Sequence, residues 1–267
     1  MTRIGRMFED LKRDGRKGLI AYLTAGDPTP DRTPALVEAL VRGGADLIEL
    51  GVPFSDPIAD GPVIRRAGER ALQAGTTLAK VLEIASCVRQ RSQVPLLLFT
   101  YLNPVVRYGL DRLARDAAAA GIDGCLLTDA SVEEAHDYVD AMHRSGLDTV
   151  FLAAPTSTER RLRLVARYSS GFVYLVSRTG VTGERETLSG AVAPLVHAMR
   201  AVTKLPLAVG FGISRPDQVG EAGRDVEAVV VGSAFVRLIE RYSRTESLEA
   251  ELEALTRWLK DGFAGAG

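Results

Sequence analysis

Short apolar runs recur along the whole chain, and each is followed by a segment whose apolar residues have helical spacing. We identify eight runs, at residues 19–23, 47–50, 96–99, 125–127, 150–153, 173–176, 207–209 and 228–231. A buried strand that alternates with an amphipathic helix is typical of repeated βα units around a parallel sheet. Eight such alternations predict an α/β fold, a closed (β/α)8 TIM barrel.

The segments between the runs include clear amphipathic helices. One has apolar residues at the i, i+3, i+4 and i+7 positions of a helical face, namely Leu78, Val81, Leu82, Ala85 and Val88. Thr76 and Thr77 precede it and are suited to cap its first turn. Two further helices lie outside the eight repeats, an N-terminal one with Ile4, Met7, Phe8 and Leu11 on one face and a C-terminal one with Leu248, Leu252, Leu255 and Leu259. We expect both to cover the ends or flanks of the barrel.

The size and composition of the chain favour one domain. A chain of 267 residues, of which 46% are apolar, is able to bury a large core. Its length suits a single α/β barrel, and no segment has the composition of a linker. We therefore expect a single TIM-barrel domain over residues 1–267.

Charge and hydropathy exclude several classes of protein. The 33 basic and 34 acidic residues leave no positive excess for nucleic acid. Residues 1–8 lack the apolar core of a signal peptide, and no apolar run approaches the length that spans a membrane. Cys87 and Cys125 are too few for a disulfide framework, and we expect both to be small buried groups. These features predict a cytoplasmic protein.

Residues 49–62, with the sequence ELGVPFSDPIADGP, place carboxylates where an apolar strand ends. Glu49 lies in the second half of the strand, and Asp56 and Asp60 follow in a short loop of Gly, Pro and Ser. In a barrel of parallel strands the active site lies at the carboxyl ends of the strands, so these groups are candidates for acid/base chemistry. The alternative is that Glu49 caps a neighbouring helix or pairs with an arginine.

The later loops have the features of a phosphate site. Gly210, Phe211 and Gly212 follow the seventh run, and Gly232 and Ser233 follow the eighth directly before a helix. Backbone N–H groups at a helix N-terminus bind anions well when glycine leaves them uncovered. The glycine-containing loop 178–183 is expected to reach the same region. The alternative is that these glycines only make tight turns.

The positions of lysine and histidine narrow the reaction class. The lysines fall in predicted helices or before strands, at Lys12, Lys17, Lys80, Lys204 and Lys260, so none is placed for a Schiff base. The histidines fall on predicted helices, at His136, His143 and His197, and we expect no metal site. A phosphate site with carboxylates remains, which favours proton transfer on a substrate that accommodates the developing charge itself.

At these motifs the sequence resembles the tryptophan synthase alpha chain family. The matching segments are 22–28 (YLTAGDP), 49–62, 174–183 (YLVSRTGVTG), 210–214 (GFGIS) and 232–233, and the resemblance extends over about residues 8–258. It implies retro-aldol cleavage of indole-3-glycerol phosphate to indole and glyceraldehyde 3-phosphate, in tryptophan biosynthesis. No cofactor is implied in this chain, because the indole ring accepts the electrons of the breaking bond.

The resemblance also implies roles for individual residues. Glu49 is the general acid/base at the ring carbon and the side-chain hydroxyl, and Asp60 accepts a hydrogen bond from the indole N–H. The loops after the second and sixth strands are expected to close over the substrate, with Thr182 meeting Asp60. Substrate contacts are expected from Tyr22, Ile64, Tyr101, Tyr174, Thr182 and Phe211, and phosphate contacts from Gly183, Gly212, Gly232 and Ser233.

The expected partner is a tryptophan synthase beta chain that carries pyridoxal phosphate, in an alpha-beta-beta-alpha heterotetramer. One departure bears on this partner: residues 128–131 read Thr-Asp-Ala-Ser, where the family usually has Pro-Asp-Leu-Pro near the docking surface. Two alternatives stay open, a stand-alone lyase that releases free indole and a noncatalytic regulatory partner of a beta chain. An unrelated phosphate-binding barrel, such as an isomerase of the same pathway, would leave residues 49–62 unexplained.

Overall fold

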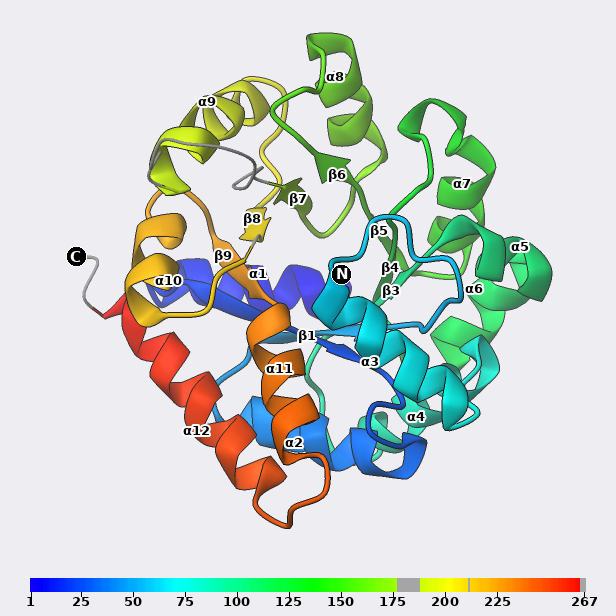
Figure 1. The fold of residues 1–267 in the computed structure, drawn as a ribbon. Coiled ribbons are helices and arrows are strands. Elements are labelled where there is room, and N and C mark those ends of the chain that lie inside the picture. Colours follow the sequence, from blue (N-terminus) through cyan, green and yellow to red (C-terminus); the bar gives the residue numbers. More distant parts are fainter. Residues whose placement is uncertain (177–187, 211, 265–267) are drawn as a thin grey trace.

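Parallel strands form a single sheet that curves round into a barrel (Figure 1). The structure is a computed structural model and describes residues 1–176, 188–210 and 212–264. Within these ranges the strands are β1 (Gly18–Thr24), β2 (Leu47–Gly51), β3 (Leu96–Thr100), β4 (Gly124–Leu127), β5 (Asp148–Val150), β6 (Leu152–Ala153), β7 (Val173–Val176), β8 (Leu207–Gly210) and β9 (Ala228–Val231). All eight predicted runs coincide with strands, so the predicted barrel is confirmed.

The barrel closes at the fifth predicted run, which the structure divides into two strands. The hydrogen-bonded order is β5-β4-β3-β2-β1-β9-β8-β7-β6, so β5 and β6 stand at its two ends. Only Phe151 separates them in the chain. Before Phe151 the backbone pairs with β4, and after it the backbone pairs with β7. The chain therefore changes neighbours at this residue, and the sheet meets itself there.

Helices surround the barrel (Figure 1). In the described residues they are α1 (Arg3–Arg13), α2 (Thr33–Arg42), α3 (Pro62–Gln73), α4 (Leu78–Arg89), α5 (Leu102–Tyr108), α6 (Leu110–Ala119), α7 (His136–Arg144), α8 (Glu159–Tyr168), α9 (Leu188–Arg200), α10 (Pro216–Gly223), α11 (Ser233–Tyr242) and α12 (Leu248–Lys260), with 3-10 turns at Pro30–Arg32, Val132–Glu134 and Asp261–Phe263. Thr77 caps α4, as predicted, by accepting a hydrogen bond from the Lys80 backbone N–H. None of these helices is both long enough and apolar enough to cross a bilayer.

Predictions about three residue types are tested by the fold. The lysines lie in helices α1, α4 and α12 or shortly before β1 and β8, and the histidines lie in α7 and α9, as predicted. The prediction that both cysteines are buried is wrong for Cys87, which is exposed. Cys87 lies between Ala85 and Val88 on α4, but it points away from the face that these two residues bury.

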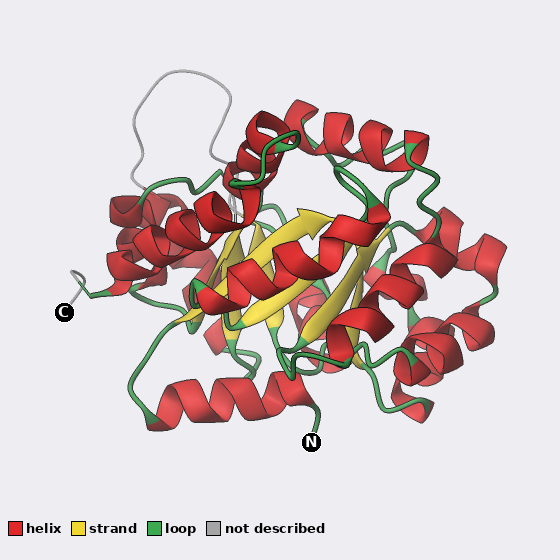
Figure 2. Cartoon of the chain, turned by 90° about the horizontal axis from the view of Figure 1, so that it is seen from below, coloured by secondary structure: helices red, strands yellow, loops and turns green. Residues whose placement is uncertain are grey.

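The interior of the barrel is a separate apolar core, closed at one end by α1. Its buried members come from alternate positions of the strands and from one face of α1, namely Ile4, Phe8, Leu11, Ile20, Leu47, Leu97, Leu126, Val150, Phe172, Ala208, Ala228 and Val230. Figure 2 shows α1 lying across the end of the strands. The rings of Phe8 and Phe172 meet there at 5.6 Å between centroids. Because these contacts involve the first residues of the strands, α1 covers the amino-terminal end of the barrel.

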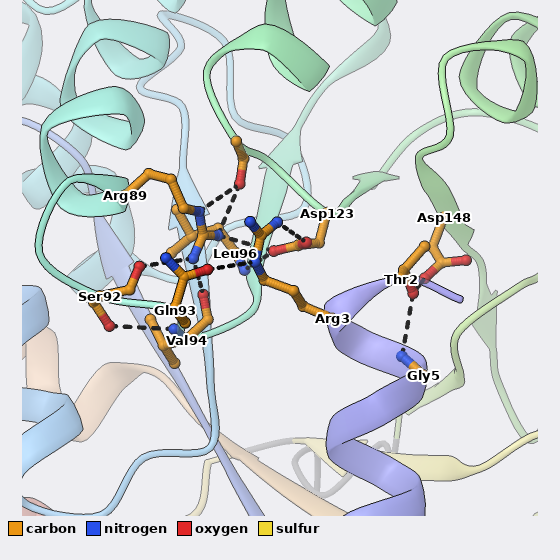
Figure 3. A network of polar contacts seen from close by, with 11 residues as sticks. Thr2, Arg3, Gly5, Arg89, Ser92, Gln93, Val94, Leu96, Asp123 and Asp148 are labelled. Atoms are coloured by element: carbon orange, nitrogen blue, oxygen red, sulfur yellow. Dashed lines mark hydrogen bonds and ion pairs between the residues drawn. The ribbon is translucent and has the colours of Figure 1, made fainter.

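Polar contacts hold the start of α1 in this position (Figure 3). Arg3 forms an ion pair of 3.0 Å with Asp123, which also pairs with Arg89 at 2.9 Å. Asp123 in addition accepts a hydrogen bond from the Leu96 backbone N–H, so its buried carboxylate is well compensated. The Thr2 hydroxyl donates to Asp148. With this end covered, a ligand would enter at the carboxyl ends of the strands.

We expect Ile4→Ala to lower the free energy of unfolding by about 2–5 kcal/mol, because it leaves a cavity in the barrel interior. Ile4 is fully buried. Urea unfolding followed by circular dichroism measures the change. Arg6→Ala, on the exposed face of the same helix, serves as the control and should change stability by no more than about 0.5 kcal/mol. Equal effects of the two substitutions would contradict the role of α1 as part of the core.

Candidate active site

A cavity of about 520 Å³ lies at the carboxyl end of the barrel. It is lined by Tyr22, Glu49, Ala59, Asp60, Gly61, Ile64, Phe99, Thr128, Leu152, Tyr174, Val176, Gly210, Gly212, Val230, Gly232 and Ser233. Eight of the predicted site residues are in this set. The structure therefore brings the proposed acids and the proposed phosphate loops to one cavity.

Glu49 enters the cavity because of its place on β2. Leu47 belongs to the barrel interior, and side chains two residues apart on a strand share a face. Glu49 therefore points inward as well, one layer nearer the carboxyl end, and pairs in register with Tyr22 of β1. Its side chain is 1% exposed. The side chain thus faces the cavity and not the solvent outside the barrel.

The Glu49 carboxyl group has an unusual environment. In the described part of the chain its Oε1 atom has no hydrogen-bond partner, and no arginine or helix end is paired with it. The alternative expectation of a cap or an ion pair is therefore not met in that part. Burial raises the pKa of Glu49 to about 8, since a charged form would be poorly solvated there. At neutral pH most of the Glu49 side chains carry a proton that they are able to donate.

Asp60 lies across the cavity in the loop between β2 and α3. Burial raises its pKa to about 6, and the effect is limited by a hydrogen bond from Tyr101 and by the charge of Arg65. Asp60 is therefore mainly ionised at neutral pH, unlike Glu49. The two carboxyl groups therefore differ in protonation state within one cavity. Such a pair is suited to two roles, with the protonated group acting as an acid and the ionised group stabilising positive charge.

Tyr101 supports the Asp60 loop and is not among the residues that line the cavity. It is buried, and its hydroxyl accepts a hydrogen bond of 3.2 Å from the Ala59 backbone N–H. Its ring packs against Phe54, with 5.3 Å between centroids. Tyr101 was predicted to contact substrate, and the structure places it where it fixes the loop that carries Asp60.

Tyr22 and Tyr174 flank Glu49, and each lies directly against a glycine. A Cβ atom on Gly51 would be 2.2 Å from the Tyr22 hydroxyl, and one on Gly210 would be 2.3 Å from the Tyr174 hydroxyl. These glycines are required because any side chain would displace the ring. Burial raises the pKa of both phenols. Both tyrosines are therefore neutral beside Glu49.

The start of α11 forms the opposite side of the cavity. Gly232 ends the loop after β9, and Ser233 is the first residue of the helix. The first turn contains no acidic residue, and no side chain of the described residues caps it. Gly212, from the neighbouring loop, has φ of +64°, a conformation that favours glycine. Backbone N–H groups at such a helix start favour a phosphate.

Three predicted site residues, Thr182, Gly183 and Phe211, lie outside the described residues. Other residues of the cavity were not predicted. Phe99 packs edge-on against Tyr22, with 5.3 Å between ring centroids, and Leu152 pairs with Tyr174 across β6 and β7. The sequence does contain a clue to both residues. Each lies two positions after an apolar residue that faces the barrel interior, and residues two apart on a strand share a face.

A larger hollow, of about 1110 Å³, lies around α1 at the amino end of the barrel. Its charged lining includes Lys12 and Lys204, both exposed. Gly5 in the first turn of α1 lines this hollow, but its backbone N–H already donates to the Thr2 hydroxyl. Among the described residues, no buried carboxyl oxygen without a partner lies there. The groups suited to acid/base chemistry and to phosphate binding occur together only in the smaller cavity, among the residues that the structure describes.

Comparison with known proteins agrees with this geometry. The family model described as Tryptophan synthase alpha chain matches residues 8–264. The tryptophan synthase alpha chain of Solibacter usitatus is 78% identical over 263 residues, 98% of each chain. That of Geobacter sulfurreducens is 51% identical over 246 residues, 92% of this chain and 93% of the relative.

Solved structures give the same result. Tryptophan synthase subunit alpha from Legionella pneumophila str. Paris superposes with a TM-score of 0.91 at 35% identity, over 99% of both chains. A chain of tryptophan synthase from M. tuberculosis, in an open form with BRD0059 bound, gives 0.88 at 36% identity, over 98% of both chains. The chain described here therefore belongs to the tryptophan synthase alpha chain family.

Proposed function

We propose that Glu49 and Asp60 carry out the reaction of this family, the cleavage of indole-3-glycerol phosphate to indole and glyceraldehyde 3-phosphate. The chain is a carbon-carbon lyase of tryptophan biosynthesis. The observation that supports the two roles best is the cavity itself. It combines a buried, unpaired carboxyl group, a second carboxyl group of lower pKa, and a helix N-terminus.

The proton transfers follow from the two pKa values. Protonated Glu49 donates its proton to C3 of the indole ring, and the ring nitrogen becomes iminium-like. Ionised Asp60 accepts the N–H hydrogen bond and stabilises this positive charge, an interaction that is strong where water is excluded. The bond between C3 and the side chain then breaks, and its electrons neutralise the ring. Glu49, now a carboxylate, takes the proton of the side-chain hydroxyl as the aldehyde forms, which restores its acid form.

The remaining residues bind the two ends of the substrate. Gly232 and Ser233 hold the phosphate through backbone and hydroxyl groups at the start of α11. Gly212, from the loop after β8, and Gly183 add to this site. The apolar part of the cavity receives the indole ring, with contacts from Tyr22, Ile64, Tyr174 and Phe211. Tyr101 acts through the Asp60 loop, and Thr182 meets Asp60 when the loops close. No cofactor of this chain takes part in any of these steps.

The partner in this proposal is a beta chain that binds pyridoxal phosphate and uses the indole, in an alpha-beta-beta-alpha heterotetramer. Solved tryptophan synthases are among the similar structures. Exposed apolar side chains lie on neighbouring segments at the carboxyl end of the barrel: Ile58 is 84% exposed, and Leu102 and Val106 of α5 are also exposed. Such a group of apolar side chains is suited to a protein interface.

Two further predictions concern the chain as a whole. A cytoplasmic location remains a prediction. We also propose that residues 1–267 form a single domain, since one sheet contains every strand from β1 to β9 in the described residues.

We expect Glu49→Gln to lower kcat by about 10² to 10⁴, because glutamine keeps the shape of the side chain but cannot transfer a proton. KM should change little, since the phosphate and indole contacts remain. Steady-state release of indole from indole-3-glycerol phosphate measures both constants. Near-normal turnover of this variant would show that Glu49 is not the acid/base.

The same variant tests the protonation state of Glu49 without an activity assay. Burial raises the pKa of Glu49 from 4.5 to about 8, so between these pH values the folded chain keeps a proton that the unfolded chain releases. The stability of the unsubstituted protein should therefore decline relative to Glu49→Gln as the pH rises from about 5 to about 8.5. Thermal unfolding of both proteins at the two pH values gives the comparison. A constant difference in Tm would contradict the raised pKa.

The partnership predicts that indole release rises when a beta chain is added and that the two chains co-purify. Ile58→Glu should weaken this association, because it places a charge in the apolar docking surface. Analytical size-exclusion chromatography of the mixed chains measures the association. Strong release by the chain alone, unchanged by the beta chain, would favour a stand-alone lyase. No release under either condition would favour a regulatory module.

A further inference from the structure

Four charged side chains join α3, α11 and the loop after β1 on the outside of the barrel. Arg70 of α3 donates two hydrogen bonds of 2.8 Å to the two carboxylate oxygens of Asp27 and a third, of 2.9 Å, to Glu240 of α11. Arg66 donates two more to Glu240, at 2.9 and 3.0 Å. We call these four residues the α3–α11 clamp.

Arg70 occupies the centre of the clamp. Asp27 is 1% exposed, and Arg70 provides the only ion pair that it forms in the described residues. A two-pronged contact between a guanidinium and a carboxylate fixes both distance and orientation. Arg66, by contrast, is about half exposed, and in the described residues its only ion pair is with Glu240. Both arginines make two-pronged contacts, but the one from Arg70 reaches a buried carboxylate, whereas the one from Arg66 is partly solvated.

The two helices that the clamp joins both begin at the active-site cavity. α3 starts two residues after Asp60, and α11 starts at Ser233. Asp60, Gly232 and Ser233 all line the cavity. Figure 1 shows α3 and α11 next to each other, and they are in contact. Their relative position consequently sets the separation between Asp60 and the phosphate site.

The contact between the helices has an apolar layer near the cavity and the clamp farther from it. Ala67 of α3, Val236 of α11 and Tyr22 of β1 form the buried apolar layer. Apolar burial favours contact but is not directional, so it leaves the helices free to shift along each other by a small distance. Arg70 lies about 12 Å along α3 from Pro62, at 1.5 Å per residue. Its directional contacts with two other elements oppose such a shift.

We infer that Arg70 is a positioning residue, which holds Asp60 at the distance from the phosphate site that indole-3-glycerol phosphate requires. This inference rests on the proposed function, because it assigns the indole N–H to Asp60 and the phosphate to α11. The substrate spans both groups and depends on their separation. Indole or glyceraldehyde 3-phosphate alone depends on one group only.

The test uses the double variant Asp27→Asn/Arg70→Gln in the full chain. It removes the ionic contact and leaves neutral side chains, so that no buried charge lacks a partner. We expect kcat/KM for indole-3-glycerol phosphate to fall by about 10- to 100-fold, since small displacements of reacting groups have effects of this size. The inhibition constants of indole and of glyceraldehyde 3-phosphate should each stay within about twofold of the unsubstituted values, given that each fragment uses one subsite.

Arg66→Gln is the matched control, because it removes the exposed arginine from the same glutamate and leaves the contact between Arg70 and Asp27 intact. It should keep kcat/KM within about twofold. Thermal unfolding confirms that each variant is folded at the assay temperature. An unchanged kcat/KM in the folded double variant would overturn the inference, and so would equal losses for the substrate and for both fragments. If the unsubstituted chain does not cleave the substrate, the proposed function fails instead.

Discussion

The site depends on the buried carboxyl group of Glu49, whose Oε1 atom has no hydrogen-bond partner in the part of the chain that the structure describes. Inward-facing side chains nearer the amino end, such as Leu47, Leu97 and Leu126, are apolar, and Tyr22, Phe99 and Tyr174 line the cavity around Glu49. Removing a carboxylate from water without compensation is costly, so the group keeps its proton. At neutral pH Glu49 is therefore mainly in its acid form, whereas a glutamate in water is a carboxylate.

The two ends of the barrel differ: the amino end is filled, and the carboxyl end is open to the cavity. At the amino end, α1 fills the opening with apolar side chains, and Asp123 joins it to the strands through arginine. At the carboxyl end, β2 and β8 stop at glycines, and β9 is followed by Gly232 and the start of α11, so backbone groups remain accessible there. The amino end therefore adds to the stability of the barrel, and the carboxyl end carries the candidate site, as is usual for this architecture.

Much of the fold could be predicted from the sequence, because strand and helix periods are local properties. The same holds for Glu49, whose face follows from Leu47 two residues earlier. Features that depend on distant segments could not be predicted in this way. The change of strand neighbours at Phe151 requires pairing with β4 and β7. The support that Tyr101 gives to the Asp60 loop, and the contact of Arg70 with Asp27, arise only when separate loops and helices meet.

The contact of each cavity tyrosine with a glycine has a consequence for which molecules the protein accepts. The hydroxyl ends of Tyr22 and Tyr174 lie directly against the main chain at Gly51 and Gly210. Main-chain atoms of barrel strands are held by hydrogen bonds on both sides and yield little. The main chain therefore fixes the positions of these two rings, and with them this side of the cavity. Under the proposed function, ring systems broader than indole would clash with these rings, so the backbone would limit the size of substrate that fits.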